Sequence, residues 1–312
     1  MSVAAATRPE AAKVEGDLII EVEGVTLSFG GLTCLSDVTL SQRRGEVLAV
    51  IGPNGAGKTS LFNCLTGVYK PQEGTITFRS RQGHASAVVG RRSLPLVARA
   101  LEPGGIVPGW WMGWRAVNTK PHRVNRLGIA RTFQTTRLFN ALTAFENVKI
   151  GVESRQHTGP IGAMLRLPRA RREEKESDAR VVELLDFVGL LPRANELASS
   201  LPFGDRRRLE IARALGTRPE LLLLDEPAAG TNPAEKLELA KLVRKVNGTG
   251  VSVLLIEHDM GLVMSLAERV IVLNFGKVIA AGTPSEVQRD PAVIEAYLGT
   301  SYRAREEKGQ GP

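Results

Sequence analysis

Cysteine is scarce in this sequence: Cys34 and Cys64 are the two present in 312 residues. Two cysteines supply neither a disulfide framework nor the ligand spacing of a structural metal site, and this usage is typical of a reduced, cytosolic compartment. Cys64 falls in a stretch with the spacing of a helix and is interpreted as a small core residue. A secreted domain held together by disulfides is therefore excluded.

Long hydrophobic runs are also missing. No apolar stretch approaches the ~20 residues that a membrane-spanning helix needs. Residues 1–16 (MSVAAATRPEAAKVEG) contain no continuous apolar region and carry acids, so we do not expect a signal peptide. We expect flexible tails at residues 1–17 and 300–312. Hydrophobic residues at 43% and charged residues at 24% are the composition of an ordinary soluble globular protein.

Positive charge is concentrated in a single segment. The formal net charge is +8, and residues 81–123 alone hold seven basic residues against one acid. This local excess does not match the basic face of a nucleic-acid-binding protein, so no nucleic acid partner is expected. Tryptophan beside arginine is typical of a membrane-interface anchor or a protein-binding hot spot. The segment is interpreted either as a contact with the membrane or a partner, or as a loop that packs back onto the protein through Trp110, Trp111 and Trp114.

Residues 52–59 read GPNGAGKT and match the pattern G-x-x-x-x-G-K-[ST], in which backbone N–H groups bind phosphates. The apolar run 46–51 predicts a buried strand before this loop, and 59–68 has the spacing of a helix after it. The N-terminus of that helix directs N–H groups and the positive end of its dipole at an anion. We expect Lys58 to contact the β- and γ-phosphates of ATP and Thr59 to bind Mg²⁺. The predicted nucleotide-binding residues are Gly52, Pro53, Asn54, Gly55, Ala56, Gly57, Lys58, Thr59 and Ser60.

Two adjacent carboxylates end a second apolar run. Leu221–Leu224 predicts a buried strand, and Asp225 and Glu226 follow it. Because successive side chains of a strand point in opposite directions, the two acids are expected to have different tasks. Asp225 is predicted to lie in the Mg²⁺ shell, and Glu226 to polarise the water that attacks the γ-phosphate. Alone, the pair could be solvated acids at a strand end; beside a phosphate loop, it predicts ATP hydrolysis.

The order of expected elements indicates an α/β fold. Alternating residues at 18–29 predict one or two strands, and helical, charged patterns run from about 121 to 215. Asn232 and Thr283 each precede a proline and a glutamate with the spacing of a capping box, so a helix is expected to begin after each. This layout is typical of a mainly parallel sheet interrupted by a helical region. Further strands are expected at 38–40, 74–78, 221–224, 251–256 and 270–273, and helices at 233–246 and 260–267.

With these motifs in this order, residues 18–299 resemble the nucleotide-binding subunit of ABC (ATP-binding cassette) transporters. The resemblance implies a P-loop NTPase core with a mainly parallel sheet, an antiparallel β subdomain, and a helical subdomain at about 124–215. It makes 81–123 an insertion that is long for the family. It further implies that Gln134 is a lid glutamine that contacts Mg²⁺ and senses the membrane partner. His258 matches the switch histidine that contacts the γ-phosphate, and Phe29 stands where an aromatic ring packs on adenine.

The family's signature motif departs from its common form. Residues 201–205 read LPFGD instead of LSGGQ, the motif that caps the γ-phosphate held by an opposite subunit. Gly204 is kept as a predicted binding residue. Pro202 lacks both a hydroxyl group and a backbone N–H, and Asp205 would bring a negative charge near phosphate unless it points away. These changes predict a weakened composite site; the alternative is a Gly-Asp pair that only caps the following helix. Asn232 replaces the usual aspartate, and caps a helix about as well.

Short stretches indicate a branch of the family. Residues 230–233 (GTNP), 128–134, 257–260 and 293–299 are similar to the ATPases of branched-chain amino-acid importers. The resemblance implies an ATPase that energises import of branched-chain or related amino acids. A urea or amide importer and a lipopolysaccharide-type exporter remain alternatives. A soluble ABC ATPase that acts on nucleic acid or ribosomes is a more distant one, because one phosphate loop and no sustained heptads disfavour it.

The same resemblance implies partners and a location. A second ABC ATPase subunit, either a sister subunit or another copy of this chain, is expected to complete the nucleotide sites. Integral-membrane permease subunits are expected to bind the ATPase, and a solute-binding protein to act through them. The expected location is peripheral, at the cytoplasmic face of the inner or plasma membrane, with ATP and Mg²⁺ as the ligands.

Overall fold

The computed structural model describes residues 17–81, 85–91, 120–132, 137–154 and 168–298. The chain divides into two compact units, and each is described by itself below. Unit 1 comprises residues 1–119 and 267–312, and unit 2 comprises residues 120–266. The predicted tails (except Asp17), the three tryptophans of the insertion and Gln134 lie outside the described residues.

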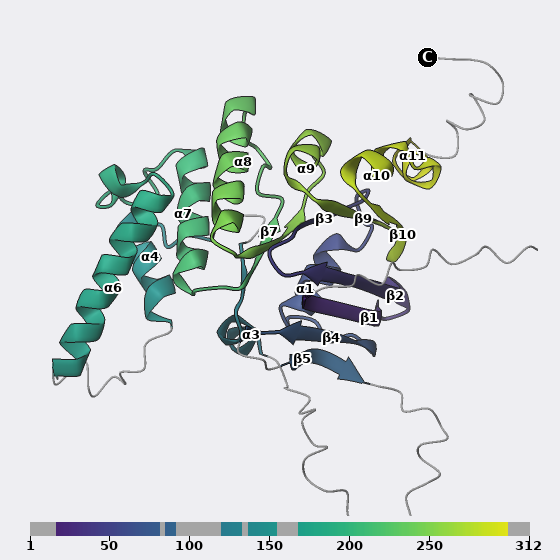
Figure 1. Cartoon of the computed structure of the whole chain (residues 1–312), viewed down its shortest axis with the longest axis horizontal. Coiled ribbons are helices and arrows are strands. Elements are labelled where there is room, and N and C mark those ends of the chain that lie inside the picture. Colours follow the sequence, from purple (N-terminus) through teal and green to yellow (C-terminus); the bar gives the residue numbers. More distant parts are fainter. Residues whose placement is uncertain (1–16, 82–84, 92–119, 133–136, 155–167, 299–312) are drawn as a thin grey trace, which may run out of the picture. The chain divides into compact units, whose positions relative to one another are not determined.

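Unit 1 contains an antiparallel sheet whose strands follow the order β2-β1-β4-β5 (Figure 1). Strand β1 shows the alternation expected of a sheet with one covered face in two parts, since Ile20 and Val22 are buried and, after an irregularity in the pairing with β2, Val25 and Leu27 are buried. This sheet confirms the expected antiparallel β subdomain. Strand β2 is much longer than the predicted residues 38–40, and no element was predicted for β5. The strands are β1 (Leu18–Phe29), β2 (Leu32–Arg43), β4 (Glu73–Arg79) and β5 (Ala85–Arg91).

A second set of strands in unit 1 carries the phosphate loop. All five residues of β3 (Val47–Ile51) are buried, which explains its unbroken apolar sequence. Strand β3 pairs in parallel with β9 (Arg269–Asn274), and β9 pairs antiparallel with β10 (Lys277–Gly282). Helix α1 follows β3 and is anchored by the buried side chains of Leu61, Phe62, Cys64 and Leu65. Helix α1 spans Lys58–Leu65. The described part of unit 1 also contains α10 (Pro284–Arg289) and α11 (Pro291–Leu298).

In its described residues, unit 2 contains three parallel strands in the order β6-β7-β8. Strands β7 (Leu221–Asp225) and β8 (Ser252–Ile256) are fully buried, as predicted from their apolar runs. Strand β6 (Ile129–Arg131) corrects the prediction, because it lies inside the stretch expected to be helical. Three residues are too few to leave a periodicity of their own, and pairing with β7 defines this strand. Helices α3 (Pro121–Leu127), α8 (Pro233–Gly248) and α9 (Met260–Leu266) accompany these strands.

Within unit 2, the stretch predicted to be helical contains three helices that lie together. Helices α4 (Ala144–Glu153), α6 (Pro168–Phe187) and α7 (Phe203–Gly216) pack against one another (Figure 1). Between α6 and α7 the chain forms a 3₁₀ turn at Leu191–Arg193. Across the described parts of both units, no helix has the length and apolar character required to span a bilayer.

Both predicted capping boxes are present. The Asn232 side chain accepts the N–H of Glu235, whose carboxylate accepts the N–H of Asn232, each at 2.9 Å. Thr283 and Glu286 form the same reciprocal pair at the start of α10. A third box, which was not predicted, begins α4 at Thr143. Local sequence thus determines where these helices begin, because the cap satisfies N–H groups that the helix cannot.

Candidate nucleotide-binding and hydrolytic residues

The phosphate loop joins β3 to α1 in unit 1, as the sequence predicts. Gly52 and Gly57 have positive φ angles of 152° and 101° and make close backbone contacts. A Cβ on Gly52 would lie 2.1 Å from the carbonyl oxygen of Leu273, and a Cβ on Gly57 would lie 2.6 Å from that of Cys34. Only glycine fits both positions, since neither carbonyl belongs to a flexible side chain. The loop is therefore packed tightly on β9 and β2 while Thr59 is exposed at the start of α1.

Lys58 lies within the loop that it completes. Its Nζ donates to the carbonyl oxygens of Gly52 at 2.6 Å and of Pro53 at 3.0 Å, and the residue is only 7% exposed. These bonds fold the lysine back over the loop from the first turn of α1. A compact ammonium group held against a ring of backbone atoms is suited to bind a polyanion.

Phe29, the predicted adenine platform, ends β1 with 46% of its surface exposed. Its ring packs edge-on against Tyr69, with ring centroids 5.0 Å apart and an interplanar angle of 71°. Tyr69, which lies in the segment after α1, was not predicted from the sequence to contact Phe29. An edge-to-face pair holds the Phe29 ring in one orientation and leaves a face for a planar ligand.

Asp225 ends β7 in unit 2 and is 3% exposed. One of its oxygens, Oδ2, accepts a hydrogen bond of 2.6 Å from the guanidinium of Arg131 at the end of β6. Arg131 was not singled out as a site residue. Its charge compensates the buried carboxylate, which would otherwise be costly to desolvate. Asp225 retains the hard oxygen donors that Mg²⁺ prefers.

Glu226 adopts a left-handed backbone conformation, with φ of 45°. For a residue with a Cβ this costs about 1–2 kcal/mol. The conformation is held by the N–H of Glu226, which donates to Ile256 at 2.9 Å, and by its carbonyl, which accepts from Ala229 at 3.1 Å. Strain maintained by its surroundings is frequent at functional positions.

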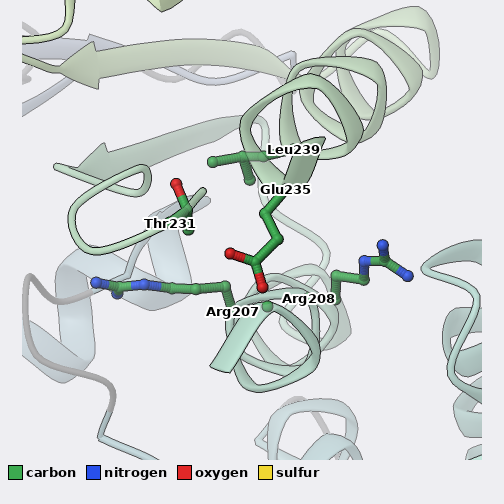
Figure 2. A pocket seen from close by; sticks show the side chains of 6 residues that line it. Arg207, Arg208, Thr231, Glu235 and Leu239 are labelled. Carbon is green, nitrogen blue, oxygen red and sulfur yellow. The ribbon is translucent and has the colours of Figure 1, made fainter. Parts of the chain in front are cut away.

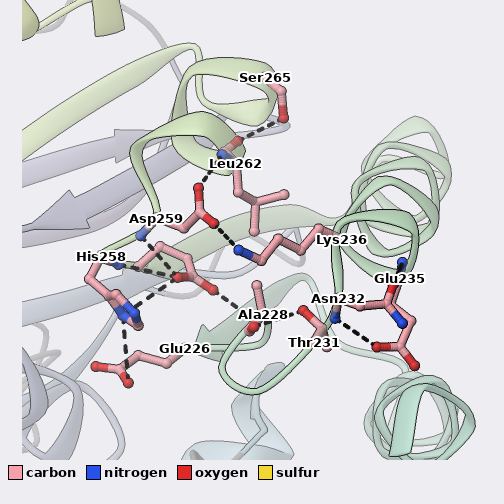
Figure 3. Close-up of polar contacts among 11 residues, drawn as sticks. Glu226, Ala228, Thr231, Asn232, Glu235, Lys236, His258, Asp259, Leu262 and Ser265 are labelled. Carbon is pink, nitrogen blue, oxygen red and sulfur yellow. Dashed lines mark hydrogen bonds and ion pairs between the residues drawn. The ribbon is translucent and has the colours of Figure 1, made fainter.

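His258 lies near Glu226, as the predicted roles require (Figure 3). Its Nδ1 is 3.9 Å from Glu226 Oε2 and 3.9 Å from Glu257 Oε2, and the side chain is 59% exposed. These separations exceed a hydrogen bond. The imidazole is therefore accessible to a ligand while its backbone is fixed at the end of β8.

Glu257, which was not predicted as a site residue, is fully buried. Its Oε1 accepts the N–H of Ala228 at 2.8 Å, and its Oε2 accepts the N–H groups of His258 at 3.2 Å and Asp259 at 3.5 Å. Burial raises the pKa of this carboxyl above its ordinary value, and the three N–H groups oppose that shift. An acid before the histidine was a visible signal, but its burial and its partner Ala228 were not.

The signature segment begins helix α7, with Pro202 as a cap that makes no side-chain hydrogen bond. The negative charge of Asp205 has partners within the same unit. Its carboxylate lies 3.4 Å from Arg193 and 3.7 Å from Arg208. Two guanidinium groups of the same chain thus compensate it. Gly204 lines a small pocket between α7 and α8 (Figure 2), whose volume of about 20 Å³ holds roughly one water molecule. The other lining residues are Arg207, Arg208, Thr231, Glu235 and Leu239.

A phosphate loop between a buried strand and a helix, within parallel α/β units, defines a P-loop NTPase. The sequence family described as "ABC transporter" matches residues 35–229. A second, described as "Branched-chain amino acid ATP-binding cassette transporter", matches residues 277–303. The chain belongs to the ABC transporter family, and it is an ATPase of the ATP-binding cassette type. The resemblance to ABC transporter ATPases and the fold class, both predicted from the sequence, are confirmed.

Individual relatives agree with this assignment. LivG of Salmonella typhimurium, a high-affinity branched-chain amino acid transport ATP-binding protein, is 42% identical over 282 residues, which cover 90% of this chain and 98% of LivG. BraF of Pseudomonas aeruginosa, with the same description, is 40% identical with the same coverage. A crystal structure of the ADP conformation of an ATP-binding cassette is similar with a TM-score of 0.70 and 28% identity, covering 90% of this chain and 99% of that one.

Proposed function

We propose that this chain is the ATP-hydrolysing subunit of a membrane importer for branched-chain or related amino acids. The observation that carries the proposal is the similarity to LivG across nearly the whole of both chains, at 42% identity. The match of residues 277–303 to the branched-chain amino acid cassette family supports the same substrate class. It lies after β9, outside the motifs that all such ATPases need, and so carries information on the branch.

Nucleotide binding is assigned to unit 1. The loop from Gly52 to Ser60 cradles the phosphates with backbone N–H groups, and the N-terminus of α1 adds a favourable dipole. Lys58 exchanges its contacts with the Gly52 and Pro53 carbonyls for the β- and γ-phosphates. Phe29, held edge-on by Tyr69, stacks on the adenine ring.

Magnesium is assigned to oxygen donors. The exposed Thr59 hydroxyl and the Asp225 carboxylate are the hard ligands that this ion takes, and Gln134 is proposed as a third. When bound, Mg²⁺ supplies positive charge that neutralises the phosphate oxygens during transfer. Arg131 orients the Asp225 carboxylate through its hydrogen bond of 2.6 Å.

Hydrolysis is assigned to Glu226 and His258 in unit 2. Glu226 orients and polarises the water that attacks the γ-phosphorus, and its left-handed backbone sets the direction of its side chain. His258 presents its exposed imidazole to the γ-phosphate. Phosphoryl transfer depends mainly on positioning and charge, so small displacements of these two groups are costly.

The assembly proposed is a pair of ATPase subunits bound to permease subunits at the cytoplasmic face of the membrane. Each phosphate loop then faces the signature segment of the other subunit, where Gly204 lies in the first turn of α7. Because Asp205 is compensated by two arginines, it does not by itself exclude an anion from this surface. If the second subunit is a sister ATPase with the common signature, that signature would face the phosphate loop of this chain. This site would then be the better of the two nucleotide sites.

The transport assignment is tested on the intact membrane complex. Purified complex should contain two related permeases and act with a solute-binding protein whose ligand is a branched-chain or related amino acid. Uptake of radiolabelled leucine into proteoliposomes should require ATP inside the same compartment as this subunit. Binding of urea or an amide by the solute-binding protein, or movement of a lipid-linked sugar instead, would reject the proposed substrate class.

The residue roles are tested by three substitutions. Glu226→Gln should bind ATP with wild-type affinity and lose turnover, and His258→Ala should likewise lose at least tenfold in kcat. Lys58→Ala should instead lose ATP binding. Wild-type hydrolysis in either Glu226→Gln or His258→Ala would reject the role assigned to that residue.

A further inference from the structure

Glu257 is a buried carboxylate to which the proposed chemistry gives no role. None of its surface is exposed, yet it lies one residue before the proposed switch histidine. Burying a carboxylate is costly unless hydrogen bonds replace its water. Here three backbone N–H groups, from Ala228, His258 and Asp259, are directed at its two oxygens. A buried carboxylate between two loops that carry proposed hydrolytic residues therefore requires an explanation.

The three donors come from two separate loops. Ala228 lies two residues after Glu226, in the segment that leaves β7, and donates to Oε1 at 2.8 Å. His258 and Asp259 lie in the segment that leaves β8, and both donate to Oε2. One side chain therefore links the loop of the proposed catalytic glutamate to the loop of the proposed switch histidine.

The link acts through backbone groups and leaves the imidazole ring accessible. The His258 N–H is 3.2 Å from Glu257 Oε2, whereas its Nδ1 is 3.9 Å from the same oxygen, beyond hydrogen-bond range. The backbone hydrogen bond therefore positions the main chain of His258 and leaves its ring nitrogens without a hydrogen bond to Glu257. The ring remains available to a phosphate, at 59% exposure.

The loop that contains His258 is also held by Asp259. Asp259 forms an ion pair with Lys236 of α8, and its Oδ1 accepts the N–H of Leu262 at 3.1 Å at the start of α9 (Figure 3). Glu257 and Asp259 thus each contribute contacts that hold the loop containing His258. The Asp259 contacts anchor the loop to helices, and Glu257 supplies the contact with the loop that follows Glu226.

We infer that Glu257 is a positioning residue for ATP hydrolysis, which sets the distance between Glu226 and His258 by joining their loops. The inference rests on the roles proposed above for those two residues. Glu257 itself touches neither water nor phosphate in this arrangement. Its effect on the reaction is transmitted through the N–H groups of Ala228 and His258.

The test uses Glu257→Gln in the full-length chain within its assembled transporter. Glutamine is nearly the same shape, but one acceptor oxygen becomes an NH₂ donor that faces backbone N–H groups whichever way the amide turns. We expect kcat to fall at least tenfold, while the Kd for a fluorescent ATP analogue changes less than twofold. Hydrogen exchange of the peptide 226–232 should speed up, because Ala228 loses a charged acceptor.

Glu46→Gln is the matched control. Glu46 is also buried, at 6% exposure, and accepts from Arg269 at 2.8 Å and from the Arg43 N–H at 2.7 Å. We expect both Glu257→Gln and Glu46→Gln to lower Tm. Glu46→Gln should nevertheless keep the wild-type kcat. Equal effects of the two variants on kcat would show that general destabilisation, and not positioning, explains the loss.

Two further arms keep the outcomes separate. If Glu226→Gln and His258→Ala abolish turnover while a folded Glu257→Gln keeps wild-type kcat, the positioning inference alone is overturned. If Glu226→Gln and His258→Ala keep turnover, the proposed roles fail first. Should Glu257→Gln not fold, Glu257→Asp keeps the charge but is one methylene too short to bond both loops. It should show the same fall in kcat at constant Kd, and wild-type kcat would overturn the inference.

Discussion

Arg131 and Asp225, 94 residues apart in the chain, are joined by a hydrogen bond of 2.6 Å between the ends of adjacent parallel strands. The two side chains are 10% and 3% exposed. A proposed Mg²⁺ ligand is therefore compensated by an arginine of the same unit. The pair explains how a carboxylate can be accommodated at the end of a fully buried strand, because the guanidinium offsets the cost of burying it.

Arg131→Met should lower the free energy of unfolding by about 3 kcal/mol, because it leaves a buried carboxylate without its partner. Urea unfolding of the nucleotide-free protein in EDTA measures the change. Arg172→Met is the control, since the Arg172–Glu176 pair is 83% and 64% exposed and such pairs contribute little. Equal losses in the two variants would contradict a buried, compensating role for Arg131.

Asn232→Ala should cost about 1 kcal/mol in the free energy of unfolding, since it removes the acceptor for the Glu235 N–H. Asn232→Asp should stay within a few tenths of a kcal/mol of the wild type, because aspartate caps a helix equally well. Urea unfolding measures both. Lys241→Ala, at an exposed interior position of α8, is the reference and should be nearly neutral. An Asn232→Ala variant as stable as this reference would refute the capping role.

Lys236→Met should remove a contribution to the free energy of unfolding that depends on pH. The hydrogen bond from Lys236, followed by the Leu262 N–H, lowers the pKa of Asp259 below its ordinary 3.8. A lowered folded-state pKa stabilises the protein above the unfolded value, and the contribution is lost as the pH falls through the folded value. The wild type should thus exceed Lys236→Met in urea midpoint at pH 7, with the gap closing below about pH 4. A gap that widens on acidification would contradict this pairing.

The Cys64 thiol should be inert in the native protein. Burial, with a smaller contribution from Cys34, raises its pKa from 9.0 to about 12. Iodoacetamide at pH 8 should therefore label the half-buried Cys34 first and Cys64 only after unfolding, as read by peptide mass spectrometry. Since the unfolded chain loses this proton earlier, the thiol also makes stability fall as pH rises from 9 towards 12. Equal labelling of both thiols in the native state would contradict this placement.

Features that depend on neighbouring residues were predictable. The phosphate loop lies where GPNGAGKT indicates, and both predicted capping boxes form, because these structures need only residues a few positions apart. The buried strands β3, β7 and β8 were also predicted, since an apolar run bounded by polar residues leaves a local pattern. Strand β6 was not, because its three residues are defined by their pairing with β7.

Partners that are distant in the chain could not be predicted. Tyr69 beside Phe29, Arg131 beside Asp225, and Ala228 at Glu257 each depend on a backbone path that no local pattern encodes. The charge of Asp205 illustrates the same limit. From the sequence it is an acid in a phosphate-binding motif, and only the fold places Arg193 and Arg208 beside it. The roles of Gln134 and of the tryptophan-rich insertion stay predictions.

The sequence by itself determined the chemistry available to this protein: a glycine-rich loop ending in Lys58 and Thr59, two carboxylates at a strand end, and a histidine after the next strand. Tertiary structure decided which buried acids are compensated and by which groups. Arg131 compensates Asp225, and backbone N–H groups bind Glu257. The physical reason is that a residue's type sets its donors, acceptors and charge. Its desolvation and its partners arise only when distant segments pack together.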